Sequence, residues 1–239
     1  MSDRVAVSPW NYCQRTAIHF LYFLAGIIFL VVPCLCSAEP SFEEIKAEYK
    51  HKDLEIRVGA IQKLEGRRDE ETVDFLMVVV DNGWENWQVK IRAIQFLGNA
   101  ENPKAVDLLL KIFASRSLHY SCPAVKTYTA IALGNFRKDG RIQDILIKGI
   151  QNDEPQVREA CVQSLGKIGD ARTVPHLLLL LNDHSVAIRL SAVHALERLA
   201  DPRTVPYLEL LSEKDSDEIV RNVAKSALEN FHNKISSYN

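Results

Sequence analysis

The chain has 239 residues, of which 47% are hydrophobic, enough to form the core of one or two ordinary domains. Its 29 Lys and Arg residues and 31 Asp and Glu residues give a formal net charge of −2. This balance argues against a nucleic-acid-binding protein, because such binding depends on neutralising phosphates.

Residues 1–38 have the pattern of a secretory signal peptide. Arg4 and Arg15 precede an uninterrupted apolar run over residues 17–32, and Pro33 ends that run. Cys36-Ser37-Ala38 then supplies small residues at the positions that a signal peptidase recognises. We therefore expect cleavage after Ala38. An uncleaved membrane anchor is the alternative, although the apolar run is shorter than the roughly 20 residues of a spanning helix.

The predicted organisation is thus a signal peptide over 1–38 and a mature domain over 39–239. Without the leader, which carries two arginines and one aspartate, the formal charge is −3. Cys34 and Cys36 do not predict a lipid anchor, because Pro33 and Leu35 stand where a lipoprotein signal has a small residue.

A twelve-residue pattern recurs six times in the mature domain. Each copy begins with a β-branched apolar residue followed by Arg or Lys, has a small residue four positions on, and has leucine eight positions on. These spacings place the three apolar positions on one stripe of an α-helix. The copies begin at Ile56, Val89, Val125, Val157, Ile188 and Val220.

Other segments with a broad apolar face precede these helices and predict a partner helix for each of them. Pro175 and Pro206 fall in the first turn of two such partners, where a missing N–H is tolerated. Gly98, Gly134 and Gly166 directly follow the stripe leucine, which predicts helix C-caps. In chain order the predicted partners are 41–50, 72–81, 105–113, 142–150, 174–181 and 205–211.

The segments DARTVPHLLLLLND and DPRTVPYLELLSEKD, which begin at Asp170 and Asp201, open two of these partner helices. Together with the following Val-Arg or Ile-Arg helices, they resemble the HEAT repeat in the short form named from phycobilin lyases. The resemblance covers residues 41–232. It implies an all-α fold, a right-handed α-solenoid of about six HEAT-like helical hairpins, with a concave face usable for binding.

A column of cations follows the first stripe position: Arg57, Lys90, Lys126, Arg158, Arg189 and Arg221. In HEAT-like repeats the corresponding arginine pairs with an aspartate in the adjacent turn. Asp153, Asp183 and Asp217 are placed for that role. A buried or half-buried arginine needs such a partner, so the column is expected to be structural.

Catalysis, cofactors and metals are not expected. Deoxyhypusine hydroxylases resemble this fold but use repeated His-Glu dipeptides as di-iron ligands, and the sequence contains none. His194 and Glu197 have a metal-compatible spacing on one helix, but a second such pair is absent. We therefore expect no catalytic residues, no cofactor and no metal site.

Cys122 and Cys161 are the two cysteines of the mature domain, too few for a disulfide scaffold. Cys161 takes the small position of its stripe and should be a buried, inert thiol. The two cysteines are offset by about 10 Å along stacked helices, beyond the roughly 7 Å reach of a disulfide. No bond is expected between them.

Two irregular turns interrupt the repetition. Residues 81–87 place Trp84 and Trp87 between paired helices, and an insertion within 115–123 carries His119 and Tyr120. Because the turns belong to successive repeats, they should lie side by side on one edge. These four residues are the candidate partner-binding site, since aromatic side chains are common interface anchors. The alternative is that both tryptophans fold back as lids over the hairpin ends.

The sequence therefore predicts an exported, non-catalytic scaffold, periplasmic or secreted, that binds another protein through a solenoid surface. Two other classes stay open. One is an accessory subunit of an enzyme, as in a chromophore lyase, and the other is a nucleic-acid-binding HEAT-like protein, which the export signal and acidic charge oppose.

Cleavage of the leader can be measured directly. The exported protein should begin at Glu39, because Pro33 ends the apolar run and Ala38 supplies the small residue before the cleaved bond. Intact-mass measurement of the exported chain checks this, and a mass that includes residues 1–38 contradicts it.

Overall fold

The computed structural model describes residues 40–117 and 120–236, and these residues form α-helices with short 3₁₀ segments and no β-strand. The predicted signal peptide lies outside the described residues. None of the helices within the described ranges combines the length and the apolar character that a membrane-spanning helix requires.

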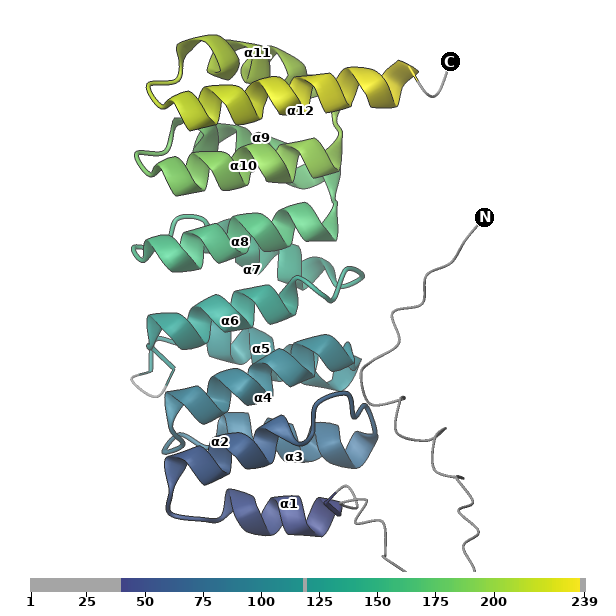
Figure 1. Cartoon of the computed structure of the whole chain (residues 1–239), viewed down its shortest axis with the longest axis vertical. Helices are drawn as coiled ribbons and strands as arrows, with labels where there is room; N and C mark the ends of the chain where they lie inside the picture. The colour runs from purple at the N-terminus through teal and green to yellow at the C-terminus, as the bar shows by residue number, and fades with distance from the viewer. Residues whose placement is uncertain (1–39, 118–119, 237–239) are drawn as a thin grey trace, which may run out of the picture. The chain divides into compact units, whose positions relative to one another are not determined.

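The helices pair in chain order as six hairpins, called repeats 1 to 6. The even-numbered helices pack on one another in one layer, and the odd-numbered helices form a second layer behind them (Figure 1). This confirms the predicted all-α solenoid. The hairpins are α1 (Phe42–Tyr49) with α2 (Leu54–Gln62), α3 (Glu70–Asp81) with α4 (Trp87–Ala100), α5 (Val106–Ala114) with α6 (Pro123–Leu133), α7 (Gly140–Gly149) with α8 (Pro155–Ile168), α9 (Val174–Leu179) with α10 (Val186–Leu199), and α11 (Val205–Lys214) with α12 (Glu218–Ser236).

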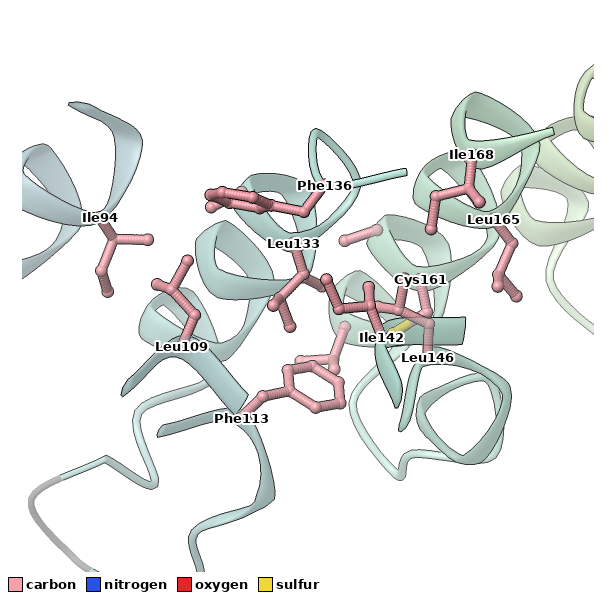
Figure 2. Close-up of a cluster of buried hydrophobic side chains, with 14 of the residues drawn as sticks. Ile94, Leu109, Phe113, Leu133, Phe136, Ile142, Leu146, Cys161, Leu165 and Ile168 are labelled. Atoms are coloured by element: carbon pink, nitrogen blue, oxygen red, sulfur yellow. The ribbon is translucent and has the colours of Figure 1, made fainter. Parts of the chain in front are cut away.

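The predicted stripe forms the core except at its first residue, Ile56, which is 38% exposed. All six small residues of the stripe are buried, and so are five of its six leucines, Leu228 being half-buried. Figure 2 shows part of this core, in which Leu133 of α6, Leu165 of α8, Phe113 of α5 and Ile142 of α7 belong to one cluster of buried side chains. Each repeat thus completes the apolar surface of the next.

Two of the three predicted glycine caps are wrong. Gly134 is the C-cap of α6, but Gly98 and Gly166 lie inside α4 and α8. A Cβ atom on Gly98 would lie 2.8 Å from the Cα of Ala132, and one on Gly166 would lie 2.8 Å from the Cα of Ala195. The glycines are needed where neighbouring inner helices almost touch, and helices α4 and α8 continue past them.

The recurrent Arg-Thr-Val-Pro segment connects one repeat to the next. Asp170 accepts a hydrogen bond from the backbone N–H of Arg172 at 2.8 Å, and the Arg172 guanidinium folds back onto the same carboxylate. This guanidinium holds the pKa of Asp170 below its usual range. The buried Thr173 hydroxyl donates to the Asp170 carbonyl at 2.7 Å. Asp201, Arg203 and Thr204 repeat these bonds in the next connection.

Proline follows two positions after this threonine and begins the outer helix. Pro175 and Pro206 stand in the first turns of α9 and α11, as predicted. Arg203 also donates to the Ala171 carbonyl of the preceding connection at 3.2 Å. The recurrent motif therefore starts an outer helix and fastens it to the preceding repeat.

The arginines of the cation column bind hairpin turns, as predicted, but two of the three predicted aspartates, Asp153 and Asp217, do not supply the carboxylate. Buried Arg189 pairs through two nitrogens with Asp215, each at 2.8 Å, and donates to the Asp183 carbonyl at 2.9 Å. Burial is the largest influence on the pKa of Asp215 and raises it, but the bonds from Arg189, the N–H of Asp217 and the charges of Arg189 and Arg221 together hold this pKa low. Asp217, the sequence-based choice, instead accepts from the N–H of Ile219 and caps α12.

Arg158 of the cation column makes similar contacts. Arg158 donates to the Asn152 carbonyl of its own turn at 2.9 Å and lies 3.9 Å from the Asp183 carboxylate of the next repeat. Asp153, also predicted as a carboxylate partner, contributes its backbone carbonyl to Arg158. Arg57, Arg158 and Arg189 thus fasten their own turns and reach the turn of the following repeat. Arg221 of the last repeat donates to the Asp215 carbonyl of its own turn.

The close approach of inner helices predicts opposite effects for two glycines. Gly98→Ala should lower the free energy of unfolding by about 1–3 kcal/mol, because the methyl group meets the backbone of α6. Gly59→Ala is the matched control, since the added Cβ in α2 would have no atom within 4 Å beyond its chain neighbours and the backbone of its own helix. The control should be stabilising by up to about 1 kcal/mol through helix propensity.

Urea unfolding of both variants measures these changes. If Gly98→Ala is as stable as Gly59→Ala, α4 and α6 do not approach as closely as described.

Candidate binding edge

The turns inside the hairpins share one edge, called here the hairpin-turn edge, and the links between repeats share the opposite edge, called the connection edge (Figure 1). The hairpin-turn edge comprises residues 50–53, 82–86, 115–117 with 120–122, 151–154, 183–185 and 215–217. The connection edge comprises residues 63–69, 101–105, 134–139, 169–173 and 200–204.

The second turn of the hairpin-turn edge, residues 82–86, is called here the tryptophan turn, because it contains Trp84 and is directly followed by Trp87. Trp84 lies in the turn itself and is 90% exposed, and Trp87 begins α4 and is 49% exposed. The Asn82 side chain accepts a hydrogen bond from the Trp84 N–H at 3.1 Å, and Asn86 caps α4 through the N–H of Gln88. The lid interpretation is therefore wrong for Trp84, because a lid would be buried.

Repeat 1 supports this turn from one side. The Glu85 side chain is largely buried and forms an ion pair with Arg57, at 3.3 Å between Oε1 and Nε. Arg57 also donates to the carbonyl of Lys52 at 2.9 Å. Burial and the Glu85 carboxylate raise the pKa of Tyr49 to about 12. Glu85 thus anchors the tryptophan turn to the end of the first hairpin.

Repeat 3 supports the turn from the other side. The Tyr120 hydroxyl donates to Asp81, with 3.0 Å to the backbone carbonyl and 3.0 Å to the carboxylate, and Lys111 pairs with the same carboxylate at 2.7 Å. Lys111 is the main cause that lowers the pKa of Asp81. Burial and the Asp81 carboxylate raise the pKa of Tyr120 to about 12.

These bonds correct the role given to Tyr120. It is 8% exposed, so its ring lies in the protein interior and offers a partner little surface. The prediction that the two irregular turns adjoin is confirmed, because Tyr120 of the insertion reaches Asp81 at the start of the tryptophan turn. His119, the fourth candidate residue, lies outside the described residues.

Lys90 lies beneath the same turn and is only 1% exposed. Its ammonium group lies 4.8 Å from the centre of the Tyr120 ring and 3.4 Å from the Gly83 carbonyl. Burial lowers the pKa of Lys90, while the charges of Glu85 and Asp81 act in the opposite direction. A cation held among a ring, a carbonyl and two carboxylates gives the turn one defined position.

Sequence reasoning identified the tryptophans but missed Asp81 and Glu85, whose carboxylates hold the turn to its neighbours. The insertion is the signal that could have pointed to Asp81, because the added residues bring Tyr120 across to the preceding repeat. The other arrangement considered for a site, His194 with Glu197, is a contact of 3.6 Å on α10, and Asn230 also donates to Glu197. Within the described ranges no three His, Cys, Asp or Glu side chains are grouped to hold a metal ion.

Cys122 and Cys161 are both free thiols. Cys161 is buried at its stripe position, as predicted, and burial raises the pKa of its thiol to about 12. A thiol with so little thiolate at neutral pH is a poor nucleophile.

A family model described as HEAT repeats matches residues 43–120, 117–184 and 144–229. Among solved structures, the complex of CpcE and CpcF of phycocyanin lyase from Nostoc sp. PCC7120 has a TM-score of 0.55 at 22% identity, covering 87% of this chain and 79% of that chain. A designed armadillo repeat protein in complex with the peptide (KR)4 has a TM-score of 0.56 at 17% identity, covering 80% of this chain and 100% of that chain. At these identities the likeness concerns the fold. No curated protein matches the sequence.

The role of Tyr120 as a fastening residue predicts a modest loss of stability. Tyr120→Phe should lower the free energy of unfolding by about 1 kcal/mol, because it removes the hydroxyl that donates to Asp81 and leaves the ring in place. Tyr128→Phe is the matched control, a half-buried tyrosine of α6 whose hydroxyl makes no hydrogen bond with the described residues. Chemical denaturation that shows equal stability for the two variants contradicts this role.

Proposed function

Since the chain belongs to the HEAT repeat family, we propose that it is an exported, non-catalytic scaffold that binds another protein through the tryptophan turn of its hairpin-turn edge. Export rests on the predicted signal peptide. The absence of catalysis rests on the sequence, which lacks the His-Glu dipeptides of the hydroxylases with a similar fold.

The observation that carries the proposal is the exposure of Trp84 on a turn that both neighbouring repeats hold in place. Leaving an indole in water has a cost, and burying one removes roughly 150–250 Å² of surface from water, or about 4–6 kcal/mol before the costs of association. Because the turn is already ordered, binding would lose little conformational entropy there. Tryptophan is also the residue type most enriched among binding hot spots.

The similar structures add support of a general kind. One is a complex of two lyase proteins, and another is a designed repeat protein with a bound peptide. Stacked repeats provide an extended surface made of local contacts, which suits docking to a macromolecule better than enclosing a small substrate.

Capture of a partner from an extract of periplasmic or secreted proteins tests the proposal. Replacing Trp84 and Trp87 by alanine should reduce capture about tenfold or more, because the exposed indoles supply the buried apolar surface. The helical circular-dichroism signal should be unchanged, since Trp84 is almost fully exposed.

The matched control replaces Leu179 and Tyr207 by alanine, two exposed apolar residues on the outer helices α9 and α11. That control should capture the partner like the wild type. If the two double variants behave alike, the tryptophan turn is not the interface.

A further inference from the structure

Two adjoining cavities lie along the connection edge and are called here the connection groove. The larger has a volume of about 850 Å³ and is lined by residues from the links after α4 and α6. The smaller, of about 400 Å³, continues toward the link after α2. Glu101, Asn135 and Lys167 line both cavities, so the two form one elongated depression.

The early end of α6 opens this groove. Helix α6 ends at its stripe leucine, Leu133. Helices α4 and α8 continue for three residues beyond their stripe leucines, to Ala100 and Ile168. Asn135 marks the change, because its amide donates to the Gly98 carbonyl at 2.8 Å and its amide oxygen accepts from Lys167. The next residue, Phe136, is buried and belongs to the core cluster of Figure 2, and the following Arg137 and Lys138 line the groove.

The lining of the groove is cationic in a protein that is acidic overall. Six lining side chains are cationic and three are anionic, while the formal charge of the whole chain is −2. The cationic residues are Arg67, Arg68, Arg137, Lys138, Arg141 and Lys167, and the anionic residues are Glu65, Glu101 and Asp139.

Part of this positive charge is engaged within the protein. Arg141 pairs with Asp139 and with Asp107, and Arg67 pairs with Asp69. Arg68, Arg137 and Lys138, in contrast, form no ion pair or hydrogen bond through their side chains with the part of the chain that the structure describes, and all three are exposed. Three cations around one groove are thus available to a ligand.

We propose that the connection groove binds an extended acidic segment of a partner protein. Arg68 lines the smaller cavity, while Arg137 and Lys138 line the larger one, so the available cations are spread along the groove. A chain carrying several carboxylates can meet such separated charges, whereas one compact anion meets only some of them.

The rest of the lining also suits a peptide. Asn99 is exposed, lines the smaller cavity and makes no side-chain hydrogen bond with the described residues, so its amide can both donate to and accept from a peptide backbone. The half-buried Phe96 supplies apolar surface for side chains between the carboxylates. A nucleic acid fits less well, because its binding depends on neutralising many phosphates and the chain is acidic overall.

Fluorescence anisotropy of a labelled peptide in which glutamate alternates with alanine tests this site on the full chain. The peptide should bind, a matched peptide with lysine in place of glutamate should not, and added salt should weaken binding. Arg137→Gln combined with Lys138→Gln should weaken peptide binding about tenfold. Neither residue has a partner to lose among the described residues, so the fold should be retained.

Lys148→Gln combined with Lys214→Gln is the matched control, because it removes the same charge from exposed lysines of α7 and α11 outside the groove. The control should bind the acidic peptide like the wild type. Equal weakening in both double variants, or equal binding of the acidic and basic peptides, would overturn the proposal.

Inorganic phosphate and an oligonucleotide serve as competitors. Either one displacing the peptide at a lower concentration than unlabelled peptide would overturn the peptide assignment in favour of a small anion or a nucleic acid. The variant with Trp84→Ala and Trp87→Ala should bind the acidic peptide normally, because those residues lie on the opposite edge. The proposal for the groove and the proposal for the tryptophan turn can therefore be contradicted independently.

Discussion

The close approach of successive inner helices is the constraint on which the other features of this solenoid depend. Gly98 faces Ala132, Gly134 faces Ser164, and in each pair a Cβ on the glycine would lie under 3 Å from the facing side chain. Ser164 also donates its hydroxyl to the Ala130 carbonyl at 2.9 Å, so its polar atom is satisfied at the contact. Because the helices stack at this spacing, the turns of each repeat lie within reach of the next, and the arginine and tyrosine bonds between repeats can form.

The two edges of the stack use this proximity differently. On the hairpin-turn edge, Asp81 and Glu85 hold one turn between repeats 1 and 3, and the exposed indoles project from a support with little freedom. On the connection edge, the links after α8 and α10 are satisfied locally by aspartate, arginine and threonine. In the links after α2 and α6, in contrast, Arg68, Arg137 and Lys138 have no such partner among the described residues, and these links line the groove.

The periodic part of the fold could be predicted from the sequence because burial on a helix has a fixed period. The stripe positions, the outer helices and the solenoid follow from that period, and Pro175 could be placed because proline is tolerated in a first helical turn. The function of Gly98 could not be predicted, because a glycine after a leucine is compatible both with a helix cap and with a close contact between helices. Only the position of the neighbouring helix distinguishes the two. Tyr120 was misassigned for a related reason: an aromatic residue in an insertion can point either way, and the Asp81 carbonyl that receives its hydroxyl is distant in sequence.

The matching links at Asp170 and Asp201 have a consequence for how such a protein changes length. The stretch from Asp170 to Ala200 begins at one link and ends just before the next, and both links make the same hydrogen bonds. A tandem duplication of that stretch would place a new copy between surfaces like those that it already packs against. A chain lengthened in this way would keep the same fold, with the tryptophan turn and the connection groove still in repeats 1 to 4.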